Sequence, residues 1–146
     1  MPKIYRIMKK DEQDEPLTGN TSATLGIRIS TDIQPDGQGN VQPNTGGMSV
    51  SPSFTTLIRR LPARMVPERF HSIVPGAIGR NTTFVWSMGE GPFQVGIIHI
   101  GLHLAIDAKD SEHGFVEPDA TMTLNEYVSH LHATKAEWKI DESEGV

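Results

Sequence analysis

The amino-acid sequence predicts an α+β fold, in which a mixed, mainly antiparallel sheet packs against an amphipathic helix near the C-terminus. Two observations predict it. Several short runs alternate between apolar and polar residues, with the two-residue period of a half-buried strand. Residues 123–138 instead have the period of a helix and begin with a capping signature. Because turn formers separate the alternating runs, we expect six or more short strands.

Length and composition restrict the possible functions. The chain of 146 residues fits one domain, spanning 1–146. A net charge of −5 and the lack of an extended basic run argue against nucleic acid as the primary partner. The absence of cysteine excludes disulfides and thiolate chemistry. No apolar run reaches the roughly 18 residues of a membrane span and no signal-peptide core is present, so we expect a cytoplasmic origin.

The first strand is expected at residues 3–8, where apolar and polar side chains alternate. This alternation places Arg6 on the same face as Ile4 and Met8. An arginine on such a face either lays its stem along the apolar surface with its head in water, or holds an anionic ligand. Both interpretations remain open from the sequence.

Two loops and a short strand are expected next. Residues 11–22 are acidic and then rich in turn formers, which predicts an exposed loop. A short strand is expected at 25–29. Residues 35–47 again contain few apolar side chains and many turn formers. Loops of this length in a small domain are usually functional or mobile.

The stretch from Gly46 to Pro52 has a pattern that is open to two interpretations. Tandem glycine is costly to order, so it occurs where the backbone passes close to another group. The following alternation predicts a strand with Ser49 and Ser51 on one face, which Pro52 ends because it has no N–H to donate. The serines either form the solvated face of an edge strand or line the floor of a ligand cleft.

The middle of the chain is expected to be irregular before two further strand regions. Residues 54–70 have near-helical apolar spacing, but two prolines interrupt it, which predicts short turns. A strand is expected at 82–88. Residues 94–106 predict either one bent strand or two, with Gly101 at the kink or bulge. The aromatic side chains of these regions are expected in the core.

The last element is predicted to be a helix. The Thr123 hydroxyl is placed to accept the amide of Glu126, while the Glu126 carboxylate reaches back to the cap. One helical stripe is apolar, which predicts packing against the sheet. Its members are Leu124, Tyr127, Val128, Leu131 and Trp138.

The six histidines do not predict a metal site. His99 and His103 have the spacing of a helical zinc pair, but their β-branched surroundings predict a strand, on which they would lie roughly 13 Å apart. His130 and His132 are two apart on a helix and point in different directions. No nucleophile elbow of the G-x-S-x-G type occurs. A hydrolase or nuclease with His99 or His103 as general base is a weaker alternative.

Three stretches together resemble a known family. They are Tyr5-Arg6, the run from Gly46 to Ser51, and the run from His113 to Pro118. Their order is similar to that of ADP-ribosyltransferases with an Arg, Ser-x-Ser, Glu signature. The chain more closely resembles the small ADP-ribosyltransferase-like toxins delivered by bacterial type VI secretion. The shared features are a Tyr-Arg first strand, a Gly-Gly-x-Ser-Val turn and a late run, here His113, Val116, Pro118 and Met122.

The resemblance implies a split sheet of the ADP-ribosyltransferase type, with NAD as the substrate. It implies catalytic roles for Arg6, Ser49 and Glu117. It implies NAD contacts for Arg6, Gly46, Gly47, Ser49, Ser51 and His113. In this scheme the Arg6 fork binds the diphosphate, the glycines leave space beside the nicotinamide amide, and the serines bind a ribose. Glu117 would stabilise the ribosyl cation.

The chain also departs from the pattern of these families. Arginine-modifying transferases carry an acidic or amide residue two before the glutamate, where this chain has Phe115, which argues against arginine as the acceptor. The toxin group needs no acid at the position of Glu117. The other interpretation of Glu117 is an exposed strand end, and Glu90 is then a second candidate for the catalytic acid. A toxin would imply a cognate immunity protein and secretion without a signal peptide. The alternative function is a non-catalytic binding, adaptor or immunity module.

Overall fold

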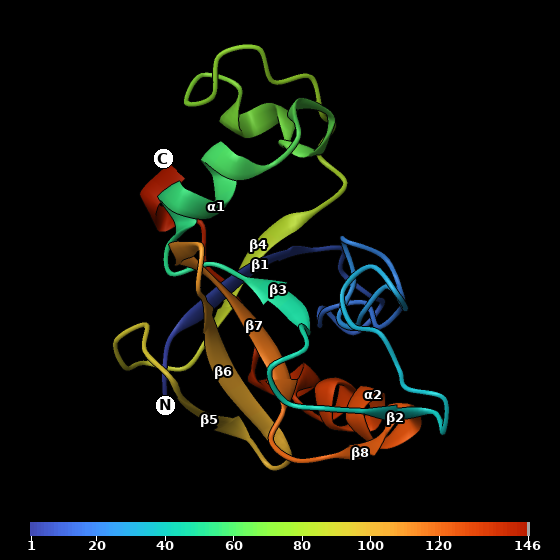
Figure 1. Ribbon diagram of the computed structural model, residues 1–146. Coiled ribbons are helices and arrows are strands. Elements are labelled where there is room, and N and C mark those ends of the chain that lie inside the picture. Colours follow the sequence, from blue (N-terminus) through green and yellow to red (C-terminus); the bar gives the residue numbers. More distant parts are fainter. Residues whose placement is uncertain (146) are drawn as a thin grey trace.

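The computed structural model describes residues 1–145 and shows an α+β protein with antiparallel sheets (Figure 1). Within these residues, the first sheet has the order β1 (Ile4–Met8), β4 (Phe84–Met88), β9 (Lys139–Ile140). The second has the order β3 (Met48–Val50), β7 (Asp110–Pro118), β6 (Leu102–Asp107), β5 (Gly96–His99). The third pairs β2 (Asn40–Val41) with β8 (Met122–Thr123). The expected α+β class with mainly antiparallel strands and a helix near the C-terminus is confirmed, but within residues 1–145 the strands form three sheets and not one mixed sheet.

Backbone hydrogen bonds join the two larger sheets at one place, between β1 and the end of β3. There the Tyr5 amide donates to the Ser51 carbonyl and the Ser51 amide donates to the Tyr5 carbonyl, both at 2.9 Å. This bridge brings the first strand beside the serine-containing strand (Figure 1). The serine alternation is as expected, because Met48 and Val50 point into the core.

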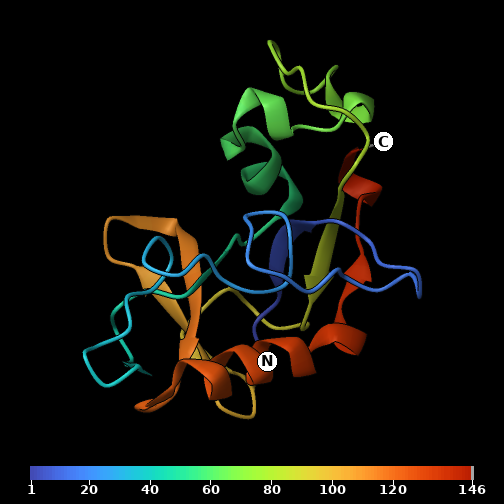
Figure 2. The same ribbon diagram turned by 90° about the vertical axis from the view of Figure 1, so that its right-hand side faces the viewer.

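Helices cover both ends of this arrangement. Figure 2 shows α1 (Phe54–Arg60) and the turns after it at one end, and α2 (Leu124–Ala133) at the other. The short turns expected for 54–70 form only after α1, as 3₁₀ turns at Ala63–Met65 and Glu68–Phe70, each of which follows a proline; the helix at Phe54–Arg60 was not expected. Further 3₁₀ turns lie at Lys135–Glu137 and Ser143–Gly145. Among residues 1–145, no helix combines the length and apolar character needed to cross a membrane.

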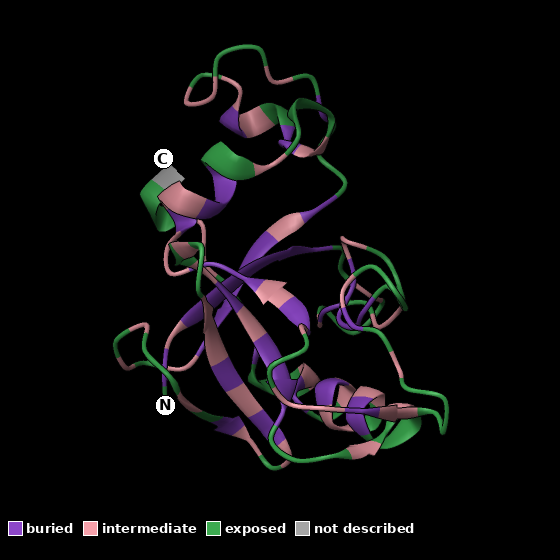
Figure 3. Cartoon of the chain, viewed as in Figure 1, coloured by how far each residue is buried: buried purple, intermediate pink, exposed green. Residues whose placement is uncertain are grey.

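The core has two apolar clusters, on opposite faces of β1. Figure 3 shows that the strands where the two larger sheets meet are largely buried. Ile4 and Met8 belong to the larger cluster, which lies between the four-stranded sheet and α2. Tyr5 and Ile7 belong to the smaller cluster, which α1 covers. Fully burying one large apolar side chain contributes about 1.5–3 kcal/mol, so these clusters hold the strands and helices together. Arg6 shares the face of Ile4 and Met8, as expected.

The strand expected at 25–29 is not formed. This segment makes isolated bridges, Thr18 with Leu25 and Ile29 with Ile33, and no ladder. The carbonyls of Thr24 and Gly26 accept hydrogen bonds from the Arg6 side chain instead of from a neighbouring strand. The expected strand is therefore wrong, because the backbone of Leu25 bonds to Leu17 and Gly19 of the preceding loop and the Gly26 carbonyl accepts from the buried Arg6 side chain.

Residues 94–106 form a hairpin and not one bent strand. Strands β5 and β6 pair antiparallel, and Gly101 lies between them with φ +79°. A left-handed conformation at this turn favours glycine. The two-strand interpretation of this region is therefore correct.

The final helix begins where the capping signature predicts. The Thr123 hydroxyl accepts the Glu126 amide at 3.1 Å and donates to the Glu126 carboxylate at 3.1 Å. The helix ends at Ala133, earlier than the expected 138, and Trp138 is reached through the following 3₁₀ turn. Trp138 is still buried and its indole donates to the Thr134 hydroxyl at 3.0 Å. The apolar stripe packs on the core as predicted.

Candidate functional site

A cleft of about 330 Å³ lies beside the contact between β1 and β3. Its sheet side contains Arg6, Ser49 and Ser51, and His113 of β7 also lines it. The opposite wall comes from α1 and the turn after it, through apolar side chains that include Leu57. Four residues that the sequence singled out therefore share one cavity, although 107 positions separate Arg6 from His113 (113 − 6).

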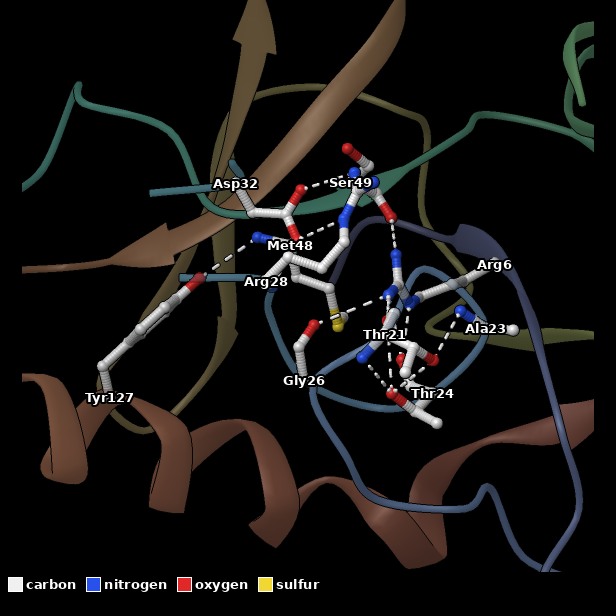
Figure 4. Close-up of polar contacts among 10 residues, drawn as sticks. All are labelled: Arg6, Thr21, Ala23, Thr24, Gly26, Arg28, Asp32, Met48, Ser49 and Tyr127. Carbon is white, nitrogen blue, oxygen red and sulfur yellow. Dashed lines mark hydrogen bonds and ion pairs between the residues drawn. The ribbon is translucent and has the colours of Figure 1, made fainter. Parts of the chain in front are cut away.

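Arg6 is held in the cleft by backbone carbonyls (Figure 4). Its Nε and Nη2 donate to the Thr24 carbonyl at 3.1 and 2.9 Å, and its Nη1 donates to the Ser49 carbonyl at 2.9 Å. Nη2 also lies 3.4 Å from the Thr21 carbonyl. These bonds attach the loop before residue 27 to β3. The guanidinium thus has a structural function as well as a place in the cleft.

The charge of Arg6 has no carboxylate partner. The residue is 5 % exposed, and within residues 1–145 no carboxylate lies within 4.0 Å of its guanidinium. Burial lowers the pKa of Arg6 to about 10, so the side chain stays charged at neutral pH. A buried cation with only neutral partners is costly unless an anion approaches it. One N–H of Nη1 has no acceptor among the described residues and can donate to such an anion.

Further cations surround the cleft. Arg28 pairs with Asp32 at 2.9 Å, and Arg60 pairs with Asp110 and, at 3.5 Å, with Glu112. Arg64 is exposed and has no carboxylate within 4.0 Å in the described part of the chain. The lining therefore contains more positive than negative side chains, which favours an anionic ligand.

The two serines offer free hydroxyls to the cleft. Ser49 is partly buried and Ser51 is buried, and both line the cavity. Neither side-chain hydroxyl is hydrogen-bonded to another residue within 1–145, although both backbones are engaged. Of the two interpretations of this strand, the structure therefore supports the cleft. Hydroxyls of this kind donate to and accept from the hydroxyls of a sugar.

His113 lies at the edge of the cleft, on the long strand β7. Its Nδ1 is 3.0 Å from the Asp107 carboxylate, and its ring packs edge-on against Phe115 with centroids 4.7 Å apart. The hydrogen bond from His113 holds the pKa of Asp107 below its usual value. The imidazole is therefore fixed in orientation next to the cavity.

Glu117 does not line this cleft. It is 3 % exposed, so it is not the exposed strand end that the sequence left open. One carboxylate oxygen accepts the Asn44 amide at 2.7 Å, and the other lies 3.2 Å from Nδ1 of His103, its partner across β6 and β7. The carboxylate thus fixes the turn that precedes β3.

Gly46 and Gly47 also lie outside the lining of the cleft. A Cβ on Gly46, which has φ +119°, would lie 2.3 Å from the Asp32 carbonyl oxygen. A Cβ on Gly47 would lie 2.4 Å from the carbonyl oxygen of Val116. The close approach that the glycine pair permits is therefore to the backbone of the chain itself.

The histidines of the β5–β6 hairpin are paired with glutamates. His99 lies 3.3 Å from Glu137, and His103 contacts Glu117. No group of three or more potential metal ligands comes together among residues 1–145. Neither histidine lines the cleft, so the weaker hydrolase or nuclease alternative gains no geometric support.

Sequence reasoning missed four charged residues of the lining. They are Arg28, Asp32, Arg60 and Arg64. The only local signal is the opposite charge of Arg28 and Asp32 at a spacing of four, which is common in turns and helices without function. Their approach to the cleft depends on the folded loop around residue 30.

The fold and the cleft together define an α+β protein with a cationic, hydroxyl-lined cavity. Comparisons with protein-family models, with curated proteins and with solved structures found no match.

Proposed function

We propose that the chain binds NAD in this cleft and cleaves the bond between nicotinamide and ribose, as an ADP-ribosyltransferase or NAD-glycohydrolase-like toxin. The observation that carries the proposal is the buried, carboxylate-free Arg6 beside the free hydroxyls of Ser49 and Ser51 in one cavity. The resemblance of three ordered stretches to type VI toxins supports the same function.

The chemistry of the lining matches the parts of a dinucleotide. The diphosphate carries two negative charges, which suit the charge and the one unpaired N–H of Arg6 and the exposed guanidinium of Arg64. The apolar wall of α1, with Leu57, suits the face of a planar ring. Ser49 and Ser51 suit the ribose hydroxyls. His113 stands at the edge of the same cavity and is proposed as a further contact.

The arrangement of the sheets supports the same class. Strands β1 and β3 pair only through Tyr5 and Ser51 and otherwise belong to different sheets, with the cleft beside their contact. We propose that this arrangement is the split sheet of the ADP-ribosyltransferase type. Gly46 and Gly47 would then act indirectly, by holding the start of β3.

The proposed reaction breaks the C1′–N bond of the nicotinamide riboside. Both bonding electrons leave with nicotinamide, which departs as a neutral molecule. The ribosyl cation is captured by a lone pair of the acceptor or of water, which then loses a proton to solvent. The acceptor would be a molecule inside the target cell, and a co-encoded immunity protein would protect the producing cell.

The first test measures NAD binding and cleavage by the purified chain. NAD should raise the melting temperature, because a ligand that binds only the native state stabilises it, and nicotinamide should be released. Arg64→Gln should raise the Kd for NAD about tenfold, as expected for the loss of one charge-assisted contact. Arg64 is chosen because Arg6 also supports the fold. Arg80→Gln, at another exposed arginine, is the control.

The outcomes separate the two functions. Release of nicotinamide by the wild type, lost in Ser49→Ala and kept in Ser129→Ala on the exposed side of α2, supports the enzyme. Binding of NAD without release of nicotinamide would contradict the enzyme function and support the alternative, a non-catalytic binding module. Absence of both would overturn the proposed function.

A further inference from the structure

We infer that Asp32 is the carboxylate that stabilises the ribosyl cation in this cleft. The inference rests on the proposed cleavage of NAD and names a group that the sequence did not single out. Among the described residues that line the cavity, Asp32 is the only acidic one. Glu117 does not line the cavity.

The backbone of Asp32 is fixed next to the first residues of β3. Its carbonyl accepts the Gly47 amide at 2.9 Å, and its amide donates to the Arg28 carbonyl at 2.8 Å. Gly46 allows the backbone of β3 to approach this carbonyl without a clash. The glycine pair therefore has a functional consequence, because it places an acidic side chain beside Ser49.

The side chain of Asp32 is equally well defined (Figure 4). It is 6 % exposed, and one oxygen accepts the Arg28 amide at 2.6 Å. The other oxygen accepts Nη2 of Arg28 at 2.9 Å. The Arg28 side chain is 44 % exposed, so its guanidinium can move away from the Asp32 carboxylate. The backbone amide of Arg28 would still hold the carboxylate in place.

The electrostatics of the reaction require such a group. The cleft attracts a diphosphate through its arginines, but the same positive field opposes a cation that forms on the ribose. A carboxylate in the cavity removes this conflict, as acidic groups do in glycoside cleavage. A diphosphate would compete with the Asp32 carboxylate for the Arg28 guanidinium. The negative charge of Asp32 would then be available to the ribosyl cation.

The reaction remains balanced in this scheme. The C1′–N bond breaks with its electron pair on nicotinamide, and Asp32 stays ionised and forms no bond. The acceptor or water attacks C1′ and releases its proton to solvent. Asp32 acts only through its charge, so an uncharged side chain of the same shape should bind NAD but turn it over slowly.

The test compares Asp32→Asn with two other amide variants. Asp32→Asn should lower kcat about 100-fold, the loss typical for a removed electrostatic contact, while KM for NAD stays equal or falls. Glu117→Gln should retain a higher kcat than Asp32→Asn. Asp119→Asn, at an exposed carboxylate outside the cleft, should match the wild type. Thermal unfolding of each variant checks that it is folded.

Arg28→Gln distinguishes a catalytic role of the Asp32 carboxylate from a purely structural role of its ion pair with Arg28. It should raise KM for NAD, because the diphosphate loses a cation, and should not reproduce the kcat loss of Asp32→Asn.

Two results would overturn the inference. They are a wild-type kcat in folded Asp32→Asn, and equal losses of kcat in Asp32→Asn and Arg28→Gln. Each leaves the proposed function intact if the wild type releases nicotinamide. A wild type that releases none overturns the proposed function and this inference together.

Discussion

Gly46 shows how one residue without a side chain can shape a cleft. Its φ of +119° is rarely adopted by other residues, and the carbonyl oxygen of Asp32 occupies the space where a Cβ would lie. The same contact brings the 28–32 turn against β3 and with it the side chains of Arg28 and Asp32. The conformation at Gly46 therefore helps to determine which charged side chains line the cleft.

Gly46→Ala should lower the free energy of unfolding by about 1–3 kcal/mol, because the left-handed backbone is strained and the Asp32 carbonyl must move. Denaturant midpoints measure the change. Gly37→Ala is the matched control, since no atom lies within 4 Å of the position of its added Cβ. Equal midpoints for Gly46→Ala and Gly37→Ala would contradict the prediction.

At the scale of elements, α2 links the two strands that border the cleft. The Tyr127 hydroxyl donates to the Val116 carbonyl of β7 and accepts the Met48 amide of β3 at 3.2 Å. Burial raises the pKa of Tyr127, so the hydroxyl remains a donor at neutral pH. A correctly placed helix therefore fixes β3 and its serines relative to β7.

Thr123→Ala should cost about 1 kcal/mol of stability, because the Glu126 amide loses its acceptor at the start of α2. The measurement is again the denaturant midpoint, at a constant slope. Thr82→Ala, at an exposed threonine outside the helices, serves as the control. A midpoint for Thr123→Ala equal to that of the wild type would show that the cap contributes nothing.

At the scale of the whole molecule, α2 is joined to the loop that surrounds Arg6. The ring of His132 lies near the backbone of Leu25, next to the Thr24 carbonyl that accepts from Arg6. Its Nε2 is buried without a partner in the described part of the chain. Burial, followed by the charge of Lys135, lowers the pKa of His132 below 6.5. The folded state therefore prefers the neutral ring.

Stability should fall as the pH is lowered from about 7 to about 5, where the unfolded chain takes up a proton that the folded His132 resists. The contribution is present above the unfolded pKa of 6.5 and is lost as the pH falls through the lower folded value. His132→Gln should reduce this fall, as measured by chemical unfolding at each pH. The control is His130→Gln on the same helix. An unchanged slope in His132→Gln would count against the assignment.

Local interactions explain what the sequence predicted correctly. The alternation in 3–8, the strand-forming residues in 82–88, the Thr123 cap and the prolines after α1 act over a few residues, so their effects are present in short segments. The sequence by itself therefore determined the fold class, the position of most elements and the strand that carries the serines.

Only the tertiary structure decided which groups share the cleft. Arg6 draws the backbone around Thr24 away from a strand, Asp32 enters the cavity by the contact at Gly46, and Glu117 is covered by the turn at Asn44. Each event joins segments at least 14 residues apart (46 − 32). No local pattern encodes such contacts, because burial and hydrogen bonding between distant segments are set only when the sheets pack together.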